Sequence, residues 1–408
     1  MEDYVFGVTD GDHQPPPQAK KGVPFLVISD VNTGNIKFEK SRFVEESYFC
    51  SLPDNRKASK GDLLFTVTGS YGIVIPVETE RDFCFQRHIG LIKVIVDSSW
   101  LKYVLMSKYV QSYCDEVATG TAQKTVGLAT LRDLLIPIPP LSEQQRIISV
   151  IEQYMSSVDD VKTSTSILKD CIEKVKSKIL DLAIHGKLVP QDANDEPASE
   201  LLKRINSKAV ASCDNPHYEN VPFAIPSNWV TLSLLDICDN INGLWTGKKP
   251  PFVRVGVIRN ANFTKDFKLD YSKIEYIEVE EKSFEKRHLL NGDIIVEKSG
   301  GSEKNPVGRA ILYEGDDKKF SYSNFTMILR IKDHCCVNSK YLYYYLMAVY
   351  IRGDMRKLQT QTTGLHNLIL DSYLSMSIYL PPFEEQKRIS NKIGELFKSL
   401  EAIANTLK

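Results

Sequence analysis

Acidic residues near a lysine on a β-rich run could support metal-dependent cleavage of a phosphodiester. Asp293 precedes Glu297 and Lys298, which approaches the nuclease pattern of an acid followed by an acid-x-Lys triplet. No residue separates Glu297 from Lys298, however, so the triplet is incomplete. A strand that ends after a turn explains these residues better than a nuclease site does.

Other motifs for catalysis and ligand binding are also incomplete. The run GSEKNPVGR (301–309) has Arg309 where a phosphate-binding loop needs Lys followed by Ser or Thr. Lys249-Pro250-Pro251-Phe252 lacks the polar acceptor with which a DNA methyltransferase loop grips a base. His334-Cys335-Cys336 has no spaced partner ligands, and no nucleophile elbow occurs. We therefore expect no catalytic residue, no metal site and no cofactor on this chain.

Polar loop side chains at matched places in the two halves of the chain are candidates for contact with DNA. Arg, Lys, Asn and Gln pair with base edges, while Ser and Thr suit phosphate oxygens. The strings TVTGSYG (66–72) and EKSGGSEKN (297–305) stand out because each follows a Gly-Asp strand start and contains glycines that allow close approach. A solvated polar loop residue remains the alternative at each position. The candidates are Lys20, Lys21, Asn32, Thr68, Ser70, Tyr71, Gln86, Arg87, His88, Lys248, Lys249, Arg259, Asn260, Asn262, Lys298, Ser299, Lys304, Asn305, Ser323 and Asn324.

An internal repeat organises the chain. The segment GLATLRDLLIPIPPLSEQQRI (127–147) matches ILDSYLSMSIYLPPFEEQKRI (369–389) at an offset of 242. Upstream, Lys60-Gly61-Asp62 matches Asn291-Gly292-Asp293 at an offset of 231, so the copies differ by loop insertions. A period of this length indicates a duplicated domain that presents two different surfaces.

A long helix is predicted after each repeat. From a predicted N-cap at Ser142, with Gln145 as its capping-box partner, apolar residues alternate at steps of four and three as far as 185, interrupted only by Thr165. Gly186 provides the stop. We expect the two helices to pair along this seam, with Ile151 and Val158 facing the second helix; an ordinary domain core is the alternative. The seam residues are Ile147, Ile151, Tyr154, Val158, Val161, Leu168, Ile172, Val175, Ile179, Leu182, Ile389, Ile393, Leu396, Leu400, Ile403 and Leu407.

The regions before each helix have the pattern of a mixed α/β (α+β) domain. β-rich runs at 61–67, 89–96, 292–298 and 325–331 alternate with turn signals, and helices are expected near 99–114 and 338–356. We therefore predict a first domain at 1–141, a long helix at 142–186, a connector with a short helix at 187–224, a second domain at 225–383 and a helix at 384–408.

Composition limits the classes of function. The net charge is −1; residues 221–383 have the largest basic excess, 21 Lys and Arg against 18 Asp and Glu, and residues 384–408 have 5 against 4. If the chain reads DNA, partners must supply much of the backbone contact. The eight cysteines show no CxxC spacing, which favours thiols in a reducing cytosol over zinc or disulfides. No run of about 18 apolar residues predicts a membrane span, and the N-terminus lacks a signal-peptide pattern.

Strings at three kinds of position, one of them present in two copies, together resemble the specificity subunits of type I restriction–modification systems. HGKLVPQDANDEPASELLKRI (185–205) is similar to the central region of that family, and IPSNWVTLSL (225–234) is similar to the start of a target-recognition domain. PIPPLSEQQRI and YLPPFEEQKRI resemble the transitions into its two helices. Their order and spacing extend the resemblance over nearly the whole chain.

The resemblance implies a non-enzymatic DNA-binding protein. It implies two target-recognition domains joined by long antiparallel coiled-coil helices, each domain reading one half of a bipartite site in double-stranded DNA. Two modification (methyltransferase) subunits dock on the helices, and a restriction subunit translocates and cleaves DNA. S-adenosylmethionine, Mg and ATP are then expected on these partners, in the cytoplasm.

Two departures from the family pattern leave alternatives open. The first copy lacks a counterpart of IPSNW, and the second helix stops at Lys408, so a counterpart of residues 167–190 is missing. One end of the helix pair is then open, or a modification subunit covers it. The alternatives are a fragment of a single-chain restriction–methylation enzyme, which would need a catalytic motif, and an orphan protein that binds DNA or modification subunits without supporting restriction.

Overall fold

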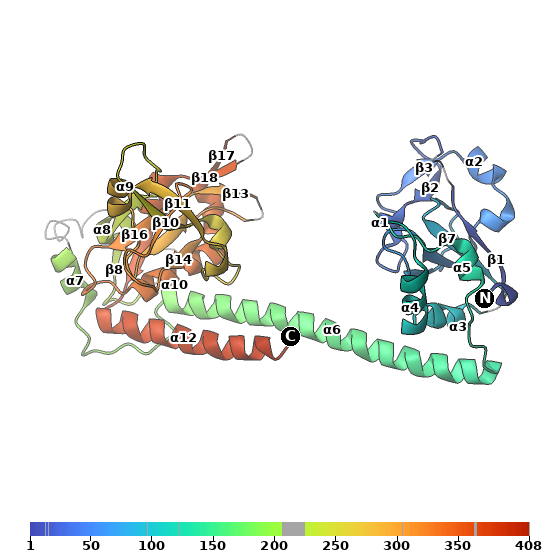
Figure 1. Cartoon of the computed structure of the whole chain (residues 1–408). Helices are drawn as coiled ribbons and strands as arrows, with labels where there is room; N and C mark the ends of the chain where they lie inside the picture. Colours follow the sequence, from blue (N-terminus) through green and yellow to red (C-terminus); the bar gives the residue numbers. More distant parts are fainter. Residues whose placement is uncertain are drawn as a thin grey trace. The chain divides into compact units, whose positions relative to one another are not determined.

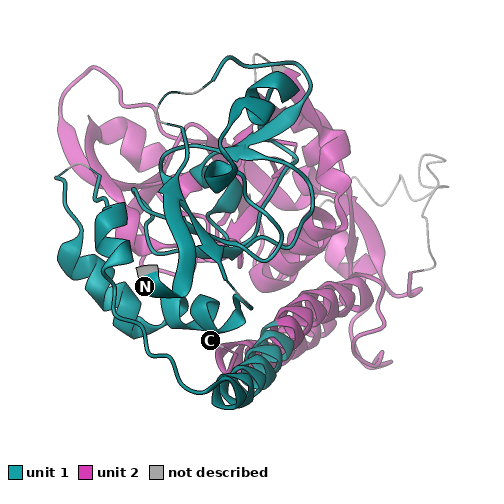
Figure 2. Ribbon diagram, turned by 90° about the vertical axis from the view of Figure 1, so that its right-hand side faces the viewer, with its two compact units in different colours: residues 1–162 teal, residues 163–408 magenta. Residues whose placement is uncertain are grey.

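The chain forms two compact units, which are described separately. The computed structural model describes residues 1–408 except 13, 15, 96, 122, 206–224, 304, 363–364 and 408. Unit 1 is Met1–Lys162 and unit 2 is Thr163–Lys408 (Figure 2). The longest helix, α6 (Leu141–Ile184), contributes to both units (Figure 1).

Unit 1 is built on two small sheets. Four antiparallel strands follow the order β1-β7-β4-β5, and three strands follow the order β3-β2-β6 with β2 parallel to β6. The strands are β1 (Val5–Asp10), β2 (Val23–Leu26), β3 (Arg42–Val44), β4 (Leu63–Thr66), β5 (Val74–Pro76), β6 (Cys84–Phe85) and β7 (Ile89–Val94). The helices before α6 are η1 (Glu2–Tyr4), α1 (Ile28–Val31), α2 (Glu46–Ser51), η2 (Asp54–Arg56), α3 (Ser99–Met106), α4 (Lys108–Val117) and α5 (Leu128–Arg132).

Unit 2 repeats this plan and adds two small sheets. Its sheets have the orders β14-β12-β16-β9, β11-β10-β15, β13-β18-β17 and β19-β8. The strands are β8 (Val230–Ser233), β9 (Cys238–Asn242), β10 (Phe252–Ile258), β11 (Glu275–Glu280), β12 (Ile294–Glu297), β13 (Ser299–Gly301), β14 (Ala310–Leu312), β15 (Phe320–Tyr322), β16 (Thr326–Ile331), β17 (Gln359–Thr362), β18 (Leu365–Leu368) and β19 (Ser377–Leu380). The helices after α6 are α7 (Ala198–Ile205), α8 (Leu234–Ile237), η5 (Asn260–Asn262), η6 (Tyr271–Lys273), α9 (Glu281–Lys286), α10 (Ser339–Arg352), η7 (Asp354–Leu358), α11 (Leu370–Leu374) and α12 (Phe383–Asn405).

The register of the strands confirms the duplication. Leu63 pairs with Ile92 between β4 and β7, and Ile294 pairs with Leu329 between β12 and β16. In both units this sheet is covered on both faces, because alternate side chains of each strand enter different apolar clusters. The parallel pair β2–β6 likewise has a counterpart in β10–β15.

The predicted elements occur with small shifts. The strands expected at 61–67, 89–96, 292–298 and 325–331 are β4, β7, β12 and β16. The helix expected near 99–114 is divided into α3 and α4, because the Ser107 hydroxyl accepts a hydrogen bond from Val110 N and starts a new helix. Most of the predicted linker before Trp229 lies outside the described residues.

The predicted N-cap of the long helix is wrong by two positions. Glu143 N and Gln144 N already bond to Pro140 O, so α6 begins at Leu141 and not after Ser142. The Gln144 side chain donates to Pro139 O at 2.8 Å, and Gln386 donates to Pro381 O at 2.9 Å in α12. The repeated glutamine therefore ties each helix to the proline turn that precedes it.

The predicted stop at Gly186 is confirmed. Gly186 has a φ of 66°, which a glycine adopts without strain. Gly186 N bonds to Ala183 O, and Lys187 N bonds to Leu182 O at 2.8 Å. These two bonds form a Schellman motif, which satisfies the last carbonyl groups of α6.

The predicted helix pairing occurs over the second half of α6, within unit 2. The helix α12 runs antiparallel to this half (Figure 1): Ile389 and Ile393 share a core cluster with Ile184, and Lys176 Nζ lies 6.0 Å from the centroid of the Phe397 ring. The buried seam residues are Ile172, Ile179, Ile389 and Ile393, and Leu182, Leu396, Leu400 and Leu407 are partly buried.

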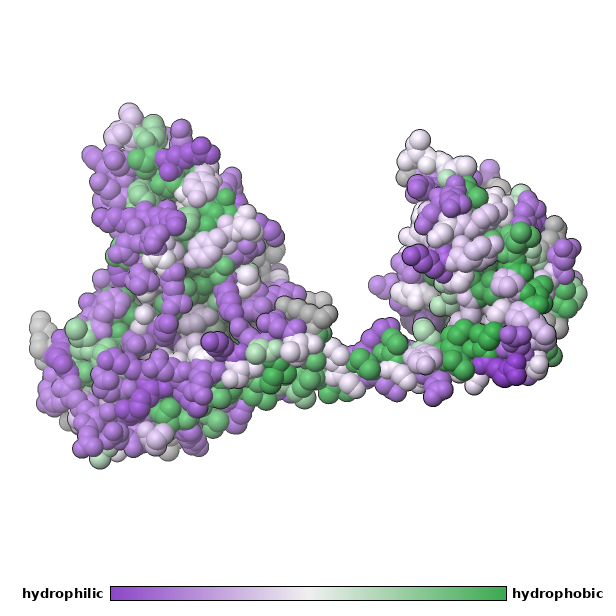
Figure 3. All heavy atoms as spheres, turned by 60° about the horizontal axis from the view of Figure 1, so that its bottom comes forward, coloured by the Kyte–Doolittle hydropathy of each residue, from purple (hydrophilic) through white to green (hydrophobic). Residues whose placement is uncertain are grey.

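For the remaining seam residues the predicted pairing is wrong within the described chain. The helix α12 has 23 residues and α6 has 44, so α12 cannot accompany the whole of α6. Exposed apolar side chains therefore line α6 (Figure 3). The exposed seam residues are Tyr154, Val158, Val161, Leu168, Val175 and Ile403. Val175 and Ile403 are exposed although they lie within the paired stretch, so helix length does not explain these two. Ile147 and Ile151 are half-buried against unit 1 and do not face α12.

The start of α12 is anchored by the strings that resemble the type I family. The buried carboxylate of Glu385 accepts hydrogen bonds from Gln191 Nε2 at 2.5 Å and Trp229 Nε1 at 3.1 Å. Arg388 donates to both carboxylate oxygens of Asp195 at 3.0 and 2.5 Å. The strings at 185–205 and 225–234 thus meet YLPPFEEQKRI at one structural junction. Burial raises the pKa of Glu385 above its usual value.

Candidate nucleic-acid interface

In unit 2 several candidate DNA contacts lie together where β12 ends. Lys298 Nζ donates to Asn242 Oδ1 at 2.9 Å, and Asn260 Nδ2 donates to Ser299 O at 2.7 Å. The Ser299 hydroxyl donates to Asn367 Oδ1 at 2.5 Å and joins β13 to β18. We call these five residues the unit 2 strand-end site.

The carboxylates beside this site have structural roles. Both Asp293 oxygens accept hydrogen bonds from Arg330, at 2.9 and 2.7 Å, and Oδ2 also accepts from Leu290 N. Glu297 is buried and lies 3.5 Å from Arg309. Burial raises the pKa of Glu297, although Arg309 opposes the shift. These contacts explain the incomplete nuclease pattern as internal ion pairs.

Lys298 is the charged group best suited to an anionic ligand in the unit 2 strand-end site. No carboxylate lies within ion-pair distance of its ammonium group among the described residues. Burial lowers the pKa of Lys298, so its charge is only partly solvated. A phosphate oxygen or a base acceptor would compensate that desolvation, because hydrogen bonds between charged partners are strong.

Nearby buried polar atoms lack partners within the described chain. They are Asn260 Oδ1, Ser323 Oγ and His366 Nδ1. Buried polar atoms are usually hydrogen-bonded, and exceptions often mark functional places. The unit 2 strand-end site therefore has more hydrogen-bonding capacity than the fold itself uses.

Unit 1 has the same backbone frame at the end of β4. Val67 N bonds to His88 O at 2.9 Å, as Lys298 N bonds to Phe325 O at 2.9 Å. The Thr125 and Thr68 hydroxyls lie 3.2 Å apart, at the positions that correspond to Asn367 and Ser299. We call Thr68, Gln86, Arg87, His88 and Thr125 the unit 1 strand-end site.

The unit 1 strand-end site differs from the unit 2 strand-end site in having a histidine, His88. Arg87 Nε donates to His88 Nε2 at 3.3 Å, so that nitrogen acts as an acceptor in a neutral ring. Burial, followed by the charge of Arg87, lowers the pKa of His88. The corresponding residues of unit 2 are Asn324 and Phe325, so the two frames carry different side chains.

Other candidates have internal partners. Asn262 is 1% exposed, and its side chain bonds to Arg259 N and Asp270 O, so its prediction as a DNA contact is wrong. The Arg259 guanidinium forms an ion pair with Glu275. Tyr71 donates to Asp115 at 2.8 Å, which raises the pKa of the phenol.

The remaining candidates stay predictions. Ser70, Asn305 and Asn324 are exposed, and Ser323 is buried at the loop after β15. Lys304 lies outside the described residues. Exposed candidates away from the two β-strand ends are Lys20, Lys21, Asn32, Lys248 and Lys249.

The sequence-based interpretation missed Asn242, Asn367 and Thr125. They belong to short segments without a clear hydrophobic period, so no element was predicted there. The repeat offset of 242, however, places Thr125 on Asn367 and could have found that pair. Within the described residues, no group of three or more His, Cys, Asp or Glu could hold a metal, and no helix is both long and apolar enough to cross a membrane. No disulfide joins the described cysteines.

Known proteins are similar to this chain in sequence. The EcoAI type I restriction enzyme specificity subunit of Escherichia coli is 26% identical, over 75% of this chain and 61% of its own length, so this chain spans about three fifths of that relative. The EcoKI subunit of E. coli K12 is 18% identical over 93% of this chain and 76% of its own length.

Solved structures support the fold. A chain from a structure on assembly and conformational transition of the type I R-M system has a TM-score of 0.65 at 18% identity, covering 100% of this chain and 91% of that one. The HsdS subunit from Thermoanaerobacter tengcongensis has a TM-score of 0.51 at 17% identity, covering 100% and 90%. The profile of the type I restriction modification DNA specificity domain matches residues 17–168 and 226–408. With two such matches on a duplicated fold, the chain belongs to the type I restriction modification DNA specificity family.

Proposed function

We propose that this chain is the sequence-reading subunit of a type I restriction–modification complex. Each unit reads one half of a bipartite target in double-stranded DNA, and the chain itself carries out no catalysis. Modification subunits supply methyl transfer with S-adenosylmethionine, and a restriction subunit supplies ATP- and Mg-dependent translocation and cleavage. The complex acts in the cytoplasm.

One observation carries this proposal: the same backbone frame presents different side chains in the two units. Lys298, Ser299 and Asn367 occupy in unit 2 the places of Val67, Thr68 and Thr125 in unit 1. Direct readout of bases depends on such side chains, whereas the frame fixes their position. Duplicated frames with different polar groups suit an asymmetric target with two unlike halves.

The charge and the exposed helix surface support binding together with partners. With a net charge of −1, the chain has little excess positive charge with which to neutralise DNA phosphates by itself. Val158 and Val161 of α6 are 45% and 66% exposed, and such apolar surface suits a protein partner. The EcoAI and EcoKI relatives are named specificity subunits of restriction enzymes.

The test is a domain exchange within the assembled complex. Residues 230–380 are replaced by the same region of a related subunit. This segment contains both β8 and β19, which pair with each other. Trp229 and Glu385, which lie outside the segment, are retained together with their hydrogen bond. Both chains are co-expressed with the modification subunits, and methylated sites are mapped across the host genome. We expect one half of the target to change and the other to persist. A change in both halves, or methyl transfer by the purified chain alone, contradicts the proposal.

A further inference from the structure

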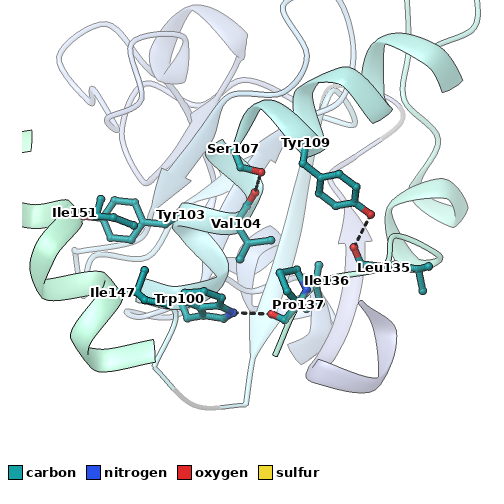
Figure 4. Close-up of a pocket in the computed structure, with 10 residues that line it drawn as sticks. All are labelled: Trp100, Tyr103, Val104, Ser107, Tyr109, Leu135, Ile136, Pro137, Ile147 and Ile151. Carbon is teal, nitrogen blue, oxygen red and sulfur yellow. Dashed lines mark hydrogen bonds between the residues drawn. The ribbon is translucent and has the colours of Figure 1, made fainter. Parts of the chain in front are cut away.

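An open apolar groove lies on unit 1 between α3, the segment 135–137 and the start of α6. Its volume is about 600 Å³ (Figure 4). Ile147 and Ile151 project from α6 toward Trp100 and Tyr103. Leu135, on the rim, is 79% exposed. The remaining lining residues are Val104, Ser107, Tyr109, Ile136 and Pro137.

The repeat identifies the matching place in unit 2. Trp100 Nε1 donates to Pro137 O at 2.9 Å, and at the matching position Tyr341 Oη donates to Tyr379 O at 2.6 Å. At the offset of 242, Ile136 corresponds to Ile378. The same offset places Ile147 on Ile389 and Ile151 on Ile393.

In unit 2 this surface is fully covered by the chain itself. Ile378, Ile389 and Ile393 are at most 1% exposed. They share an apolar cluster with residues from the end of α6, from α7 and from the region of Trp229. These residues are Ile179, Leu180, Ala183, Ile184, Ala198, Leu201, Leu202, Trp229 and Leu232. Strand β8 also pairs with β19 there, whereas the segment 135–138 forms no strand within the described structure.

The polar anchors show the same contrast. In unit 2, Glu385 accepts from Gln191 and Trp229, and Arg388 binds Asp195. Their counterparts in unit 1 are Glu143 and Arg146, both exposed and without an ion pair among the described residues. Unit 1 thus carries one side of this junction, with apolar and polar groups in the same order.

We propose that the groove of unit 1 binds a helix–turn segment of another polypeptide that resembles residues 167–205 of this chain. Its helix buries isoleucine and leucine side chains against Ile147 and Ile151. The turn after that helix brings a carboxylate to Arg146 and an amide or indole N–H to Glu143. A second copy of this chain is a poor source, because its own segment is already held through Asp195 and Gln191.

A labelled peptide of residues 167–205 tests the proposal directly. It is titrated against the full-length chain by fluorescence anisotropy, up to about 1 mM. We expect saturable binding that Leu135→Asp weakens by about 10-fold or more, since a charge enters an apolar contact. Leu235→Asp is the matched control, because Leu235 is 50% exposed on α8 in unit 2.

A charge exchange locates the contact. Arg146→Glu in the chain and Asp195→Arg in the peptide should each weaken binding, and the two together should restore it at least in part. Hydrogen exchange should show new protection at 135–151. Absence of binding at about 1 mM, or binding that neither groove substitution alters, overturns the proposal. A homodimer in sedimentation that Leu135→Asp dissolves also overturns it, in favour of a second copy. No DNA is used, so this outcome is independent of the proposed function.

Discussion

In unit 2 the first turns of α12 lie inside the core, whereas in unit 1 the matching turns of α6 line an open groove. Glu385 is fully buried and Glu143 is exposed, although both follow a Pro-Pro turn. The shared motif therefore specifies the helix start and the hydrogen bond of its glutamine to the proline turn, but not burial. Burial depends on whether the connector and the end of the preceding helix are present beside the motif.

The largest expected effect comes from placing a charge in the first turns of each helix. Ile393→Asp should destabilise unit 2 by at least about 4 kcal/mol, because Ile393 is 0% exposed and an unpaired carboxylate would be buried. Ile151→Asp should destabilise unit 1 by about 1 kcal/mol or less, because water reaches the groove. Hydrogen exchange resolved by peptide, in denaturant, reports each unit separately. Equal effects in the two units would contradict the difference in burial.

Features that depend on local sequence were predicted correctly, whereas features that depend on which segments cover the helix were not. The strands β4, β7, β12 and β16, the long helix and its stop at Gly186 could be predicted, because they depend on local periodicity and turn chemistry. The exposure of Val158 was not predicted, although the expected lengths of the two helices, 142–186 and 384–408, already left one end of the pair open. The apolar pattern extends along nearly all of α6, whereas α12 accompanies only its second half.

The strand-end sites illustrate a second limit. The Gly-Asp turns and the residues after them pointed to Lys298 and Ser299, because the repeat aligned them. Asn367 comes from a distant segment that pairs with β13, and only tertiary structure brings it there. Asn262 looked like a surface amide in sequence but closes a turn inside the fold.

The second expected effect concerns the buried carboxylate at the junction. Glu385→Ala should destabilise unit 2 by about 2 kcal/mol, because the Trp229 indole and the Gln191 amide would lose their acceptor. Glu143→Ala should change the stability of unit 1 by less than about 0.5 kcal/mol, as an exposed substitution usually does. Denaturant midpoints of both variants provide the measurement. A large loss in Glu143→Ala would show that unit 1 has a hidden partner for this carboxylate.

A smaller effect is expected in DNA binding by the assembled complex. Lys298→Ala should weaken binding to the cognate site by about 10-fold, which is a loss of 1–2 kcal/mol typical of one charged contact. The recognised half-site of unit 1 should stay unchanged. Lys340→Ala is the control, because Lys340 lies on α10, outside the site, and forms an ion pair with Glu314. Equal losses for both lysines would indicate a general charge effect and remove Lys298 from the site.

The smallest effect is a pH dependence that only unit 1 should show. The folded-state pKa of His88 is lowered, first by burial and then by the charge of Arg87. The unfolded chain therefore binds a proton more readily, so unit 1 should keep its full stability above about pH 6.5 and lose some as the pH falls toward the lowered pKa. His88→Gln should flatten this dependence, and unit 2, which has Phe325 at the matching place, should show no such change from this position. Thermal unfolding from pH 7.5 to 5.5, with hydrogen exchange to separate the units, tests this. If His88→Gln keeps the same slope as the parent chain, another group is responsible and the neutral imidazole assigned to the unit 1 strand-end site is wrong.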